Sequence, residues 1–259
     1  MVQVLLEQPG RSLATRQYEI LRLLCKHRTE LLAEQLLGKP PYEVRSGPFA
    51  GMVVTHATEG CLIPKVLGTY EQDLHPILGS LPQRGYEAVL NVGCAEGYYA
   101  VGLARLMPNV SVSAHDTDEA SRQQCQAMAA ANGVAGQVEV GDAITTGSFA
   151  SFSTRRTLVI CDIEGSERDL LDPETAPALR DLDLLVEVHE VFSPGVSDLL
   201  RQRFATSHDV EAIVAGDRHY DGSLPDLEHL DRLLCLWEWR LAGTDWLWLT
   251  SRRGARSRT

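Results

Sequence analysis

Ionisable side chains recur at the ends of successive β-type runs in this sequence of 259 residues. They are Asp116, Asp142, Asp162, Glu164 and His189. Carboxylates accept hydrogen bonds from ribose hydroxyls or an adenine amino group, and an imidazole can take up a proton near neutral pH. The combination predicts a site for a nucleoside-type cofactor next to a group that can act as a base.

A glycine-containing turn follows the first β-type run, in the order Asn91-Val92-Gly93-Cys94-Ala95-Glu96-Gly97-Tyr98. Glycine suits such a turn because a Cβ would block the close approach of the backbone to a ligand. The spacing Gly93-x-x-x-Gly97 differs from the G-x-G-x-x-G pattern of dinucleotide sites. A cofactor without phosphates therefore fits this turn better than a pyrophosphate does.

The acidic residues that end the second and third runs suit the two parts of a nucleoside. Asp116, which Thr117 follows, is placed to accept both hydroxyl hydrogens of a ribose, and Gly141-Asp142-Ala143 is placed to bond an adenine amino group. Each motif alone could be structural, since glycine turns are common and strand-end aspartates often cap helices. Their order at the ends of successive strands favours a cofactor site.

From residue 86 onward, short β-type runs alternate with helical stretches. This pattern predicts an α/β fold with a Rossmann-like, doubly wound, seven-stranded and mostly parallel sheet, covered by helices on both faces. The predicted strands are Ala88–Val92, Val110–His115, Gln137–Val140, Thr157–Asp162, Leu184–His189, Val210–Val214 and Trp246–Thr250.

Before this sheet, residues 14–37 have apolar side chains at helical spacing, and Thr69–Leu81 is predicted as a further helix with Thr69 as its N-cap. We expect residues 1–84 to form an N-terminal helical cap that recognises substrate, and residues 85–251 to form the catalytic domain. The basic residues 252–259 are expected to be a solvated tail, with an anion-binding arm as the alternative.

As a set, these motifs resemble class I S-adenosylmethionine (SAM)-dependent methyltransferases over roughly residues 86–250. Asn91 to Gly97 is similar to the first motif of that family, Asp116 to its ribose-binding acid and Gly141 to Ala143 to its adenine-side motif. The segments 162–167 and 185–190 resemble the FkbM-type branch. The resemblance implies methyl transfer to a hydroxyl, less readily an amine, of a small metabolite or natural product.

His189 is the first candidate for the base that removes a proton from the acceptor, because it ends the fifth strand next to the expected crevice. The alternative is a histidine satisfied by a backbone carbonyl. Glu164 is the second candidate and could receive a substrate hydroxyl or amine, or could instead cap the helix that begins near Ser166. Asp162 is expected to line the cofactor site.

A metal ion is not expected, although Asp162, Glu187 and His189 form a hard-ligand set that could hold Mg²⁺ or another divalent ion. A metal-assisted methyltransferase is therefore one alternative function. The others are a nucleotide-binding oxidoreductase and a cofactor-binding module without catalysis.

Further substrate contacts are expected from Tyr70, Glu71 and His75 in the helical cap, and from Glu190 beside His189. Glu71 and His75 are spaced as neighbours on one helical face. Alternatively, Tyr70 belongs to the core and its polar neighbours face solvent.

Composition narrows the remaining possibilities. A formal charge of −11 argues against binding of nucleic acid, and no run of residues is apolar enough for a membrane span. The six widely spaced cysteines are expected to be reduced and mostly buried, and the N-terminus lacks the pattern of a signal peptide, so a cytoplasmic protein is expected. Four tryptophans between residues 237 and 248 favour packing in an edge strand or the interface of a homodimer over a ligand cage.

Overall fold

A seven-stranded sheet forms the centre of the computed structural model, which describes residues 12–55, 61–240 and 244–253. The predicted tail lies outside these ranges from residue 254 onward. The strands stand in the order β5-β4-β3-β6-β7-β9-β8, and all are parallel except β9. Their bounds are β3 Ala88–Val92, β4 Ser111–His115, β5 Val138–Gly141, β6 Thr157–Cys161, β7 Asp183–Val188, β8 His208–Ile213 and β9 Asp245–Ser251.

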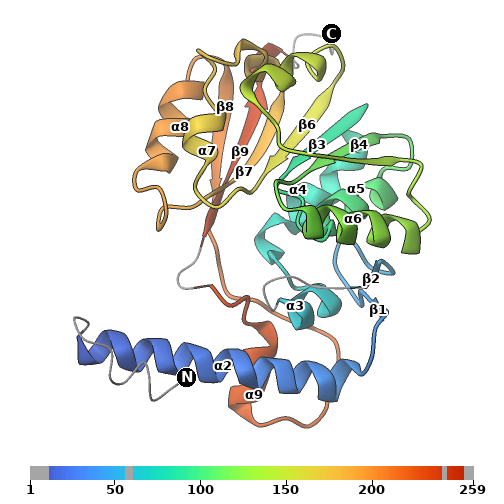
Figure 1. Ribbon diagram of the computed structural model, residues 1–259, viewed down its shortest axis with the longest axis vertical. Helices are drawn as coiled ribbons and strands as arrows, with labels where there is room; N and C mark the ends of the chain where they lie inside the picture. Colours follow the sequence, from blue (N-terminus) through green and yellow to red (C-terminus); the bar gives the residue numbers. More distant parts are fainter. Residues whose placement is uncertain (1–11, 56–60, 241–243, 254–259) are drawn as a thin grey trace.

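Helices cover both faces of the sheet, which confirms the predicted fold class (Figure 1). On one face, side chains such as Val89 and Leu158 pack with the helices α5 (Tyr98–Leu106) and α6 (Glu119–Ala131). On the other, Leu90 and Val159 share a core with α8. All five residues of β3 are buried because side chains alternate between two covered faces. On this second side lie α7 (Glu167–Leu170), α8 (Val196–Phe204) and the 3₁₀ turns η3 (Thr146–Ser151) and η4 (Pro177–Asp181).

The chain order reverses between β3 and β6. From β3 it proceeds outward through β4 to β5, and then it crosses back to β6 and continues through β7 in the opposite direction. In open α/β sheets, ligands bind outside the carboxyl ends of the strands at such a switch point. The loops that follow β3 and β6 are therefore the ones that the topology places at a binding crevice.

A second helical unit lies beyond the carboxyl ends of the parallel strands (Figure 1). It consists of α2 (Leu13–Leu37), α3 (Leu62–Leu67) and α9 (His229–Leu236), and is called the helical cap below. Leu32, Ile63 and Leu234 pack together in its core. Arg28 joins α2 to α9 through two hydrogen bonds to Asp231, of 2.8 and 2.6 Å. The cap thus includes residues between β8 and β9 as well as the N-terminal region.

The connection from the cap to the sheet contains a short hairpin of β1 (Tyr42–Glu43) and β2 (Val53–Val54), followed after α3 by η1 (Gln72–Leu74), α4 (His75–Ser80) and η2 (Leu81–Gln83). The helix predicted over Thr69–Leu81 is therefore wrong at its start. Glu71 has a left-handed backbone with φ of 46°, and its N–H donates to Glu238 Oε1 at 2.8 Å. A tertiary contact thus replaces the first helical turn.

The helix that the sequence predicts to begin near Ser166 is short. It ends at Leu170, because Pro173 disfavours helical backbone at Asp172 and cannot donate to the preceding turn. Within the described residues the cysteines form no disulfide, and all but Cys25 are buried. No helix there combines the length and the apolar character that crossing a bilayer requires.

Candidate active site

The turn after β3 is held tightly against the loop after β6. Gly93 has φ of 78°, and a Cβ at this position would lie 1.7 Å from the carbonyl oxygen of Asp162. Ala95 also has a left-handed backbone, with φ of 46°. The Asp116 carboxylate fixes the turn, since its Oδ2 accepts from the Ala95 N–H at 2.9 Å and its Oδ1 accepts from the Asp118 N–H at 2.9 Å.

A cavity of about 910 Å³ opens at this turn, and we call it the loop cavity. Its walls come from the carboxyl ends of β3, β4, β5 and β6, as the switch point requires. Lys65 and Tyr70, from the cap side, close it. Among the residues expected to bind a cofactor, those that line it are Gly93, Ala95, Asp116, Thr117, Ala143 and Asp162.

The other expected cofactor residues do not line this cavity. Asn91 is buried within β3, and Tyr98 packs edge-on against Phe49 and Tyr70. Asp142 is largely exposed and pairs with Arg122 at 3.3 Å. The residues that do not line the loop cavity are Asn91, Cys94, Glu96, Gly97, Tyr98, Gly141 and Asp142.

Glu96 forms a buried ion pair with Lys65 of α3. Burial lowers the pKa of the Lys65 ammonium, but the charge of Glu96 and its hydrogen bond outweigh burial and raise that pKa above its usual value. Lys65 also lies 4.8 Å from the centre of the Tyr70 ring. This pair joins the cap to the turn after β3. Sequence reasoning missed Lys65, although a single lysine inside the apolar run Leu62–Leu67 is a signal of a buried charge.

A second cavity, of about 560 Å³, adjoins the first, and we call it the histidine cavity. The two share Cys61, Tyr70, Asp162 and Glu164 in their walls. The histidine cavity is further lined by the end of β7, by α2 and by the segment 238–240. A ligand in the loop cavity and one in the histidine cavity would therefore meet at the loop after β6.

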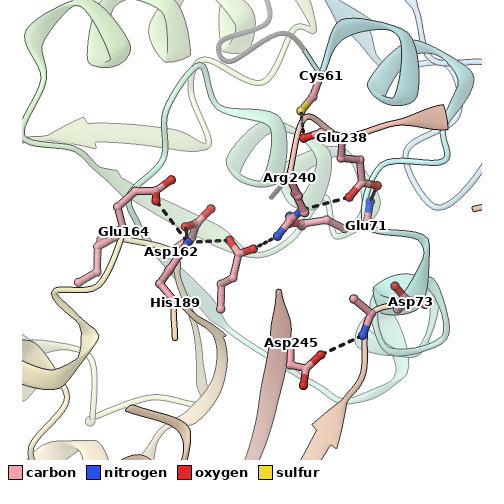
Figure 2. Close-up of polar contacts among 12 residues, drawn as sticks. Cys61, Glu71, Asp73, Asp162, Glu164, His189, Glu238, Arg240 and Asp245 are labelled. Carbon is pink, nitrogen blue, oxygen red and sulfur yellow. Dashed lines mark hydrogen bonds and ion pairs between the residues drawn. The ribbon is translucent and has the colours of Figure 1, made fainter. Parts of the chain in front are cut away.

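His189 lies at the centre of a ring of carboxylates in the histidine cavity (Figure 2). Its Nδ1 lies 2.9 Å from Glu167 Oε1. Its Nε2 faces Asp162 at 3.5 Å, Glu187 at 3.5 Å and Glu164 at 3.6 Å. If Nδ1 donates its hydrogen to Glu167, the lone pair of Nε2 points toward these three carboxylates.

These neighbours shift the titration of the cluster. Burial lowers the pKa of His189, but the hydrogen bond to Glu167 and the charges of Glu187, Glu167 and Glu164 outweigh it and raise this pKa above its usual value. Burial, together with the charge of Glu187, raises the pKa of Asp162 well above its usual range. An additional positive charge in this ring would relieve the repulsion among the carboxylates.

The same ring can serve as a metal site. One ligand atom each from Asp162, Glu164 and His189 lie within 4.8 Å of one another. The Oδ1 atom of Asp162 is buried and accepts no hydrogen bond from any residue that the structure describes. A histidine whose other ring nitrogen bonds a carboxylate is the usual arrangement around a bound metal. The residues present therefore fit a divalent cation.

Glu71 does not reach this ring directly but is linked to it through Arg240. The Arg240 guanidinium pairs with both Glu71 and Glu187, and also with Glu238 at 3.2 Å (Figure 2). Burial and the charge of Glu187 raise the pKa of Glu71 to about 8. Sequence reasoning missed Arg240, whose partner Glu71 is 169 residues distant.

Of the other expected substrate residues, Tyr70 lines both cavities. Glu190 lines the histidine cavity, and its carboxylate accepts from the backbone N–H groups of Gly195 and Ser197 at the start of α8. His75 lines neither cavity and packs beside Gly47.

Backbone strain is concentrated at the two cavities. Among the described residues, the non-glycine positions with positive φ are Glu71, Ala95, Glu164 and Trp239, at 46° to 61°. Three of them line a cavity, and Glu71 belongs to the ion-pair network beside it. Left-handed backbone is unfavourable for such residues and persists where the surroundings impose it, most often at functional sites.

No family model and no curated protein matches this sequence. Solved structures with a similar fold include an O-methyltransferase from Bacillus cereus in complex with S-adenosylhomocysteine (SAH). The two sequences are 14% identical, the match covers 73% of this chain and 89% of that chain, and the TM-score is 0.44. A cofactor-bound protein from MTB shares 15% identity, covers 94% of this chain and 93% of that chain, and has a TM-score of 0.45. The precorrin 8w decarboxylase from Methanobacterium thermoautotrophicum shares 14% identity with this sequence. The match covers 68% of this chain and 88% of that chain, and the TM-score is 0.44.

Proposed function

We propose that this protein is a SAM-dependent methyltransferase that transfers a methyl group to a hydroxyl of a small metabolite or natural product. The observation that carries the proposal is the adjacency of the two cavities. A cavity with the turn after β3 and Asp116 in its wall opens beside a cavity with His189 in its wall, and they share Asp162 and Glu164.

In this proposal the loop cavity holds the cofactor, whose sulfonium supplies an activated methyl group. Each oxygen of Asp116 accepts one backbone N–H, which leaves a further lone pair on each for the two ribose hydroxyls. The carboxylates of Asp162 and Glu164 would favour a cationic sulfonium at the junction of the cavities. Asp142 would act near the adenine only if its exposed side chain turned inward from Arg122.

The histidine cavity would hold the acceptor. A neutral His189, oriented by Glu167, accepts the hydroxyl proton at Nε2 and becomes an imidazolium. That cation is then stabilised by the three carboxylates that face Nε2. Glu164 is the most exposed of them and can orient the acceptor hydroxyl. The resemblance to the FkbM-type branch supports a hydroxyl of a natural product, and the amine remains the second acceptor class.

A second candidate is a metal-assisted form of the same reaction, which the closeness of Asp162, Glu164 and His189 favours. These three residues would hold Mg²⁺ or another divalent cation, and Glu167 would fix the histidine ring through Nδ1. Such an ion, when bound, polarises an acceptor oxygen and lowers its pKa. The two candidates differ in whether His189 moves a proton or keeps a ligand in place.

Substitution of His189 by alanine tests the proposal. With His189 as the base, His189→Ala should bind SAH as the wild type does and should lose about 10²- to 10⁴-fold in methyl transfer, measured as SAH released with a panel of hydroxylated acceptors. Full activity of the variant would contradict the assignment of the base. Dialysis against EDTA separates the candidates, because only the metal-assisted enzyme should lose activity and regain it with Mg²⁺.

A further inference from the structure

The wall of the histidine cavity that faces away from the sheet contains two cations. Arg22 and Lys26 stand one helical turn apart on α2, and both line this cavity. Trp239 lines the same wall, and the ammonium of Lys26 lies 4.4 Å from the centre of its ring. The indole N–H of Trp239 donates to Thr29 Oγ1 at 2.8 Å, which fixes the ring against α2.

Neither cation has a carboxylate partner in the part of the chain that the structure describes. Most other charged groups around the cavity are engaged. Arg240 pairs with three glutamates, and Glu190 accepts two backbone N–H groups. Arg28, on the same helix as the two cations but outside the cavity, pairs with Asp231. The Nε of Arg22, in contrast, is buried and makes no hydrogen bond to any described residue.

The opposite wall of the cavity is acidic, since it contains the carboxylates around His189. Apolar surface is also present, because Val191 and Phe192 both line the cavity and are 63% and 61% exposed. The cavity is therefore divided into an end with two cations and a tryptophan face, and an end with a base. A neutral polar acceptor would leave the two cations unmatched.

We propose that Arg22 and Lys26 bind an anionic group, a carboxylate or a phosphate, on an acceptor whose apolar body lies between Trp239 and Phe192. This inference rests on the proposed function, and it specifies the acceptor as an acid whose hydroxyl points toward His189. A guanidinium can bind a carboxylate or a phosphate through two parallel hydrogen bonds, and an ammonium adds a point charge. Indole rings and apolar side chains give a flat acceptor its orientation.

The test uses full-length protein saturated with SAH, and calorimetry with matched probes. 3-Hydroxybenzoate is compared with the neutral 3-hydroxybenzamide, and phenyl phosphate is compared with phenol. At least one acid should bind tenfold or more tightly than its neutral counterpart, and the pair that shows the preference identifies the anion. The indole N–H resonance of Trp239, assigned with Trp239→Phe, should shift only with the preferred acid.

The double variant Arg22→Gln/Lys26→Gln should lose this preference and keep the affinity of the wild type for SAH. Lys39→Gln, which removes the same kind of charge from an exposed position outside the cavity, should retain the preference. Because neither Arg22 nor Lys26 pairs with a described carboxylate, the double variant should fold. If it does not, Lys26→Arg should keep the preference and Lys26→Gln alone should reduce it.

Equal binding of acids and neutral probes, absence of binding by both acids, or a preference that survives in the double variant would overturn the inference. Failure of the wild type to bind SAH would overturn the proposed function instead. The preference for acids can then still be measured on the protein without SAH, so the two failures are distinguishable.

Discussion

The two cavities meet at one loop but are assembled in different ways. The loop cavity is built mainly by turns that each follow directly on a strand, so the order of strands in the sheet brings Gly93, Asp116 and Asp162 together. The histidine cavity combines the end of β7 with α2 and with the segment 238–240, which are far apart in the sequence. Local turns thus determine one half of the site, and tertiary packing determines the other.

The halves also differ in electrostatics. In the loop cavity, the carboxylate of Asp116 accepts hydrogen bonds from two backbone N–H groups. In the histidine cavity, buried carboxylates repel one another and are balanced by His189 and Arg240. Dependence on pH and on added cations should therefore originate in the histidine cavity.

Loss of the buried ion pair between the helical cap and the turn after β3 should have the largest effect on stability. Lys65→Met removes the cation that pairs with the buried Glu96 carboxylate, which should lower the free energy of unfolding by about 3–5 kcal/mol. Chemical denaturation measures this loss. Lys65→Met/Glu96→Gln removes both charges and should recover much of it. A single variant as stable as the wild type would show that the pair does not hold the cap to this turn.

A smaller loss is expected from Gly93→Ala, which is confined to the loop cavity. Left-handed backbone costs alanine about 1–2 kcal/mol, and here the Cβ would also displace the Asp162 carbonyl. Gly133→Ala is the matched control, because Gly133 has φ of 71° but no atom within 4 Å of the added Cβ. Thermal unfolding should show a greater loss for Gly93→Ala, and only this variant should weaken SAH binding. Equal losses would contradict the tight contact.

The smallest predicted effect is a change in the pKa of His189, which lies in the histidine cavity. The hydrogen bond to Glu167 and the charge of its carboxylate raise the pKa of His189, so Glu167→Gln should lower that pKa. Because the neutral imidazole is the base, the acid limb of activity should move to lower pH. NMR titration of the His189 ring measures the shift directly. The pKa of His75, which burial lowers, should not change in this variant. An unchanged pKa of His189 would contradict the role of Glu167.

The difference between the two cavities explains which strands, turns and side chains could be predicted from the sequence. All seven strands overlap β-type runs of the sequence, because these runs are rich in apolar residues and bounded by turns. The turn at Gly93 and the carboxylate of Asp116 are also predictable, because each follows its strand immediately. The helix predicted from Thr69 fails because Glu71 bonds Glu238, a contact that no local pattern encodes.

The buried charges around the two cavities could not be predicted for the same reason. Lys65 pairs with a residue 31 positions away and Arg240 with one 169 positions away. Arg22 and Lys26 look like the solvent face of a helix until α2 is placed over the end of β7. The tryptophans divide similarly. Trp246 and Trp248 pack on one face of β9, which lies between β7 and β8 and is not the predicted edge strand, whereas Trp239 lines a cavity.

Calorimetric titration with SAH tests most directly the central claim that the loop cavity binds the cofactor. The wild type should bind SAH with micromolar affinity and should not respond to NADH. Asp116→Ala should abolish this binding while remaining folded, and Glu119→Ala, an exposed neighbour outside the cavity, should leave it unchanged. Binding of NADH without SAH, or undiminished SAH binding by Asp116→Ala, would contradict the account.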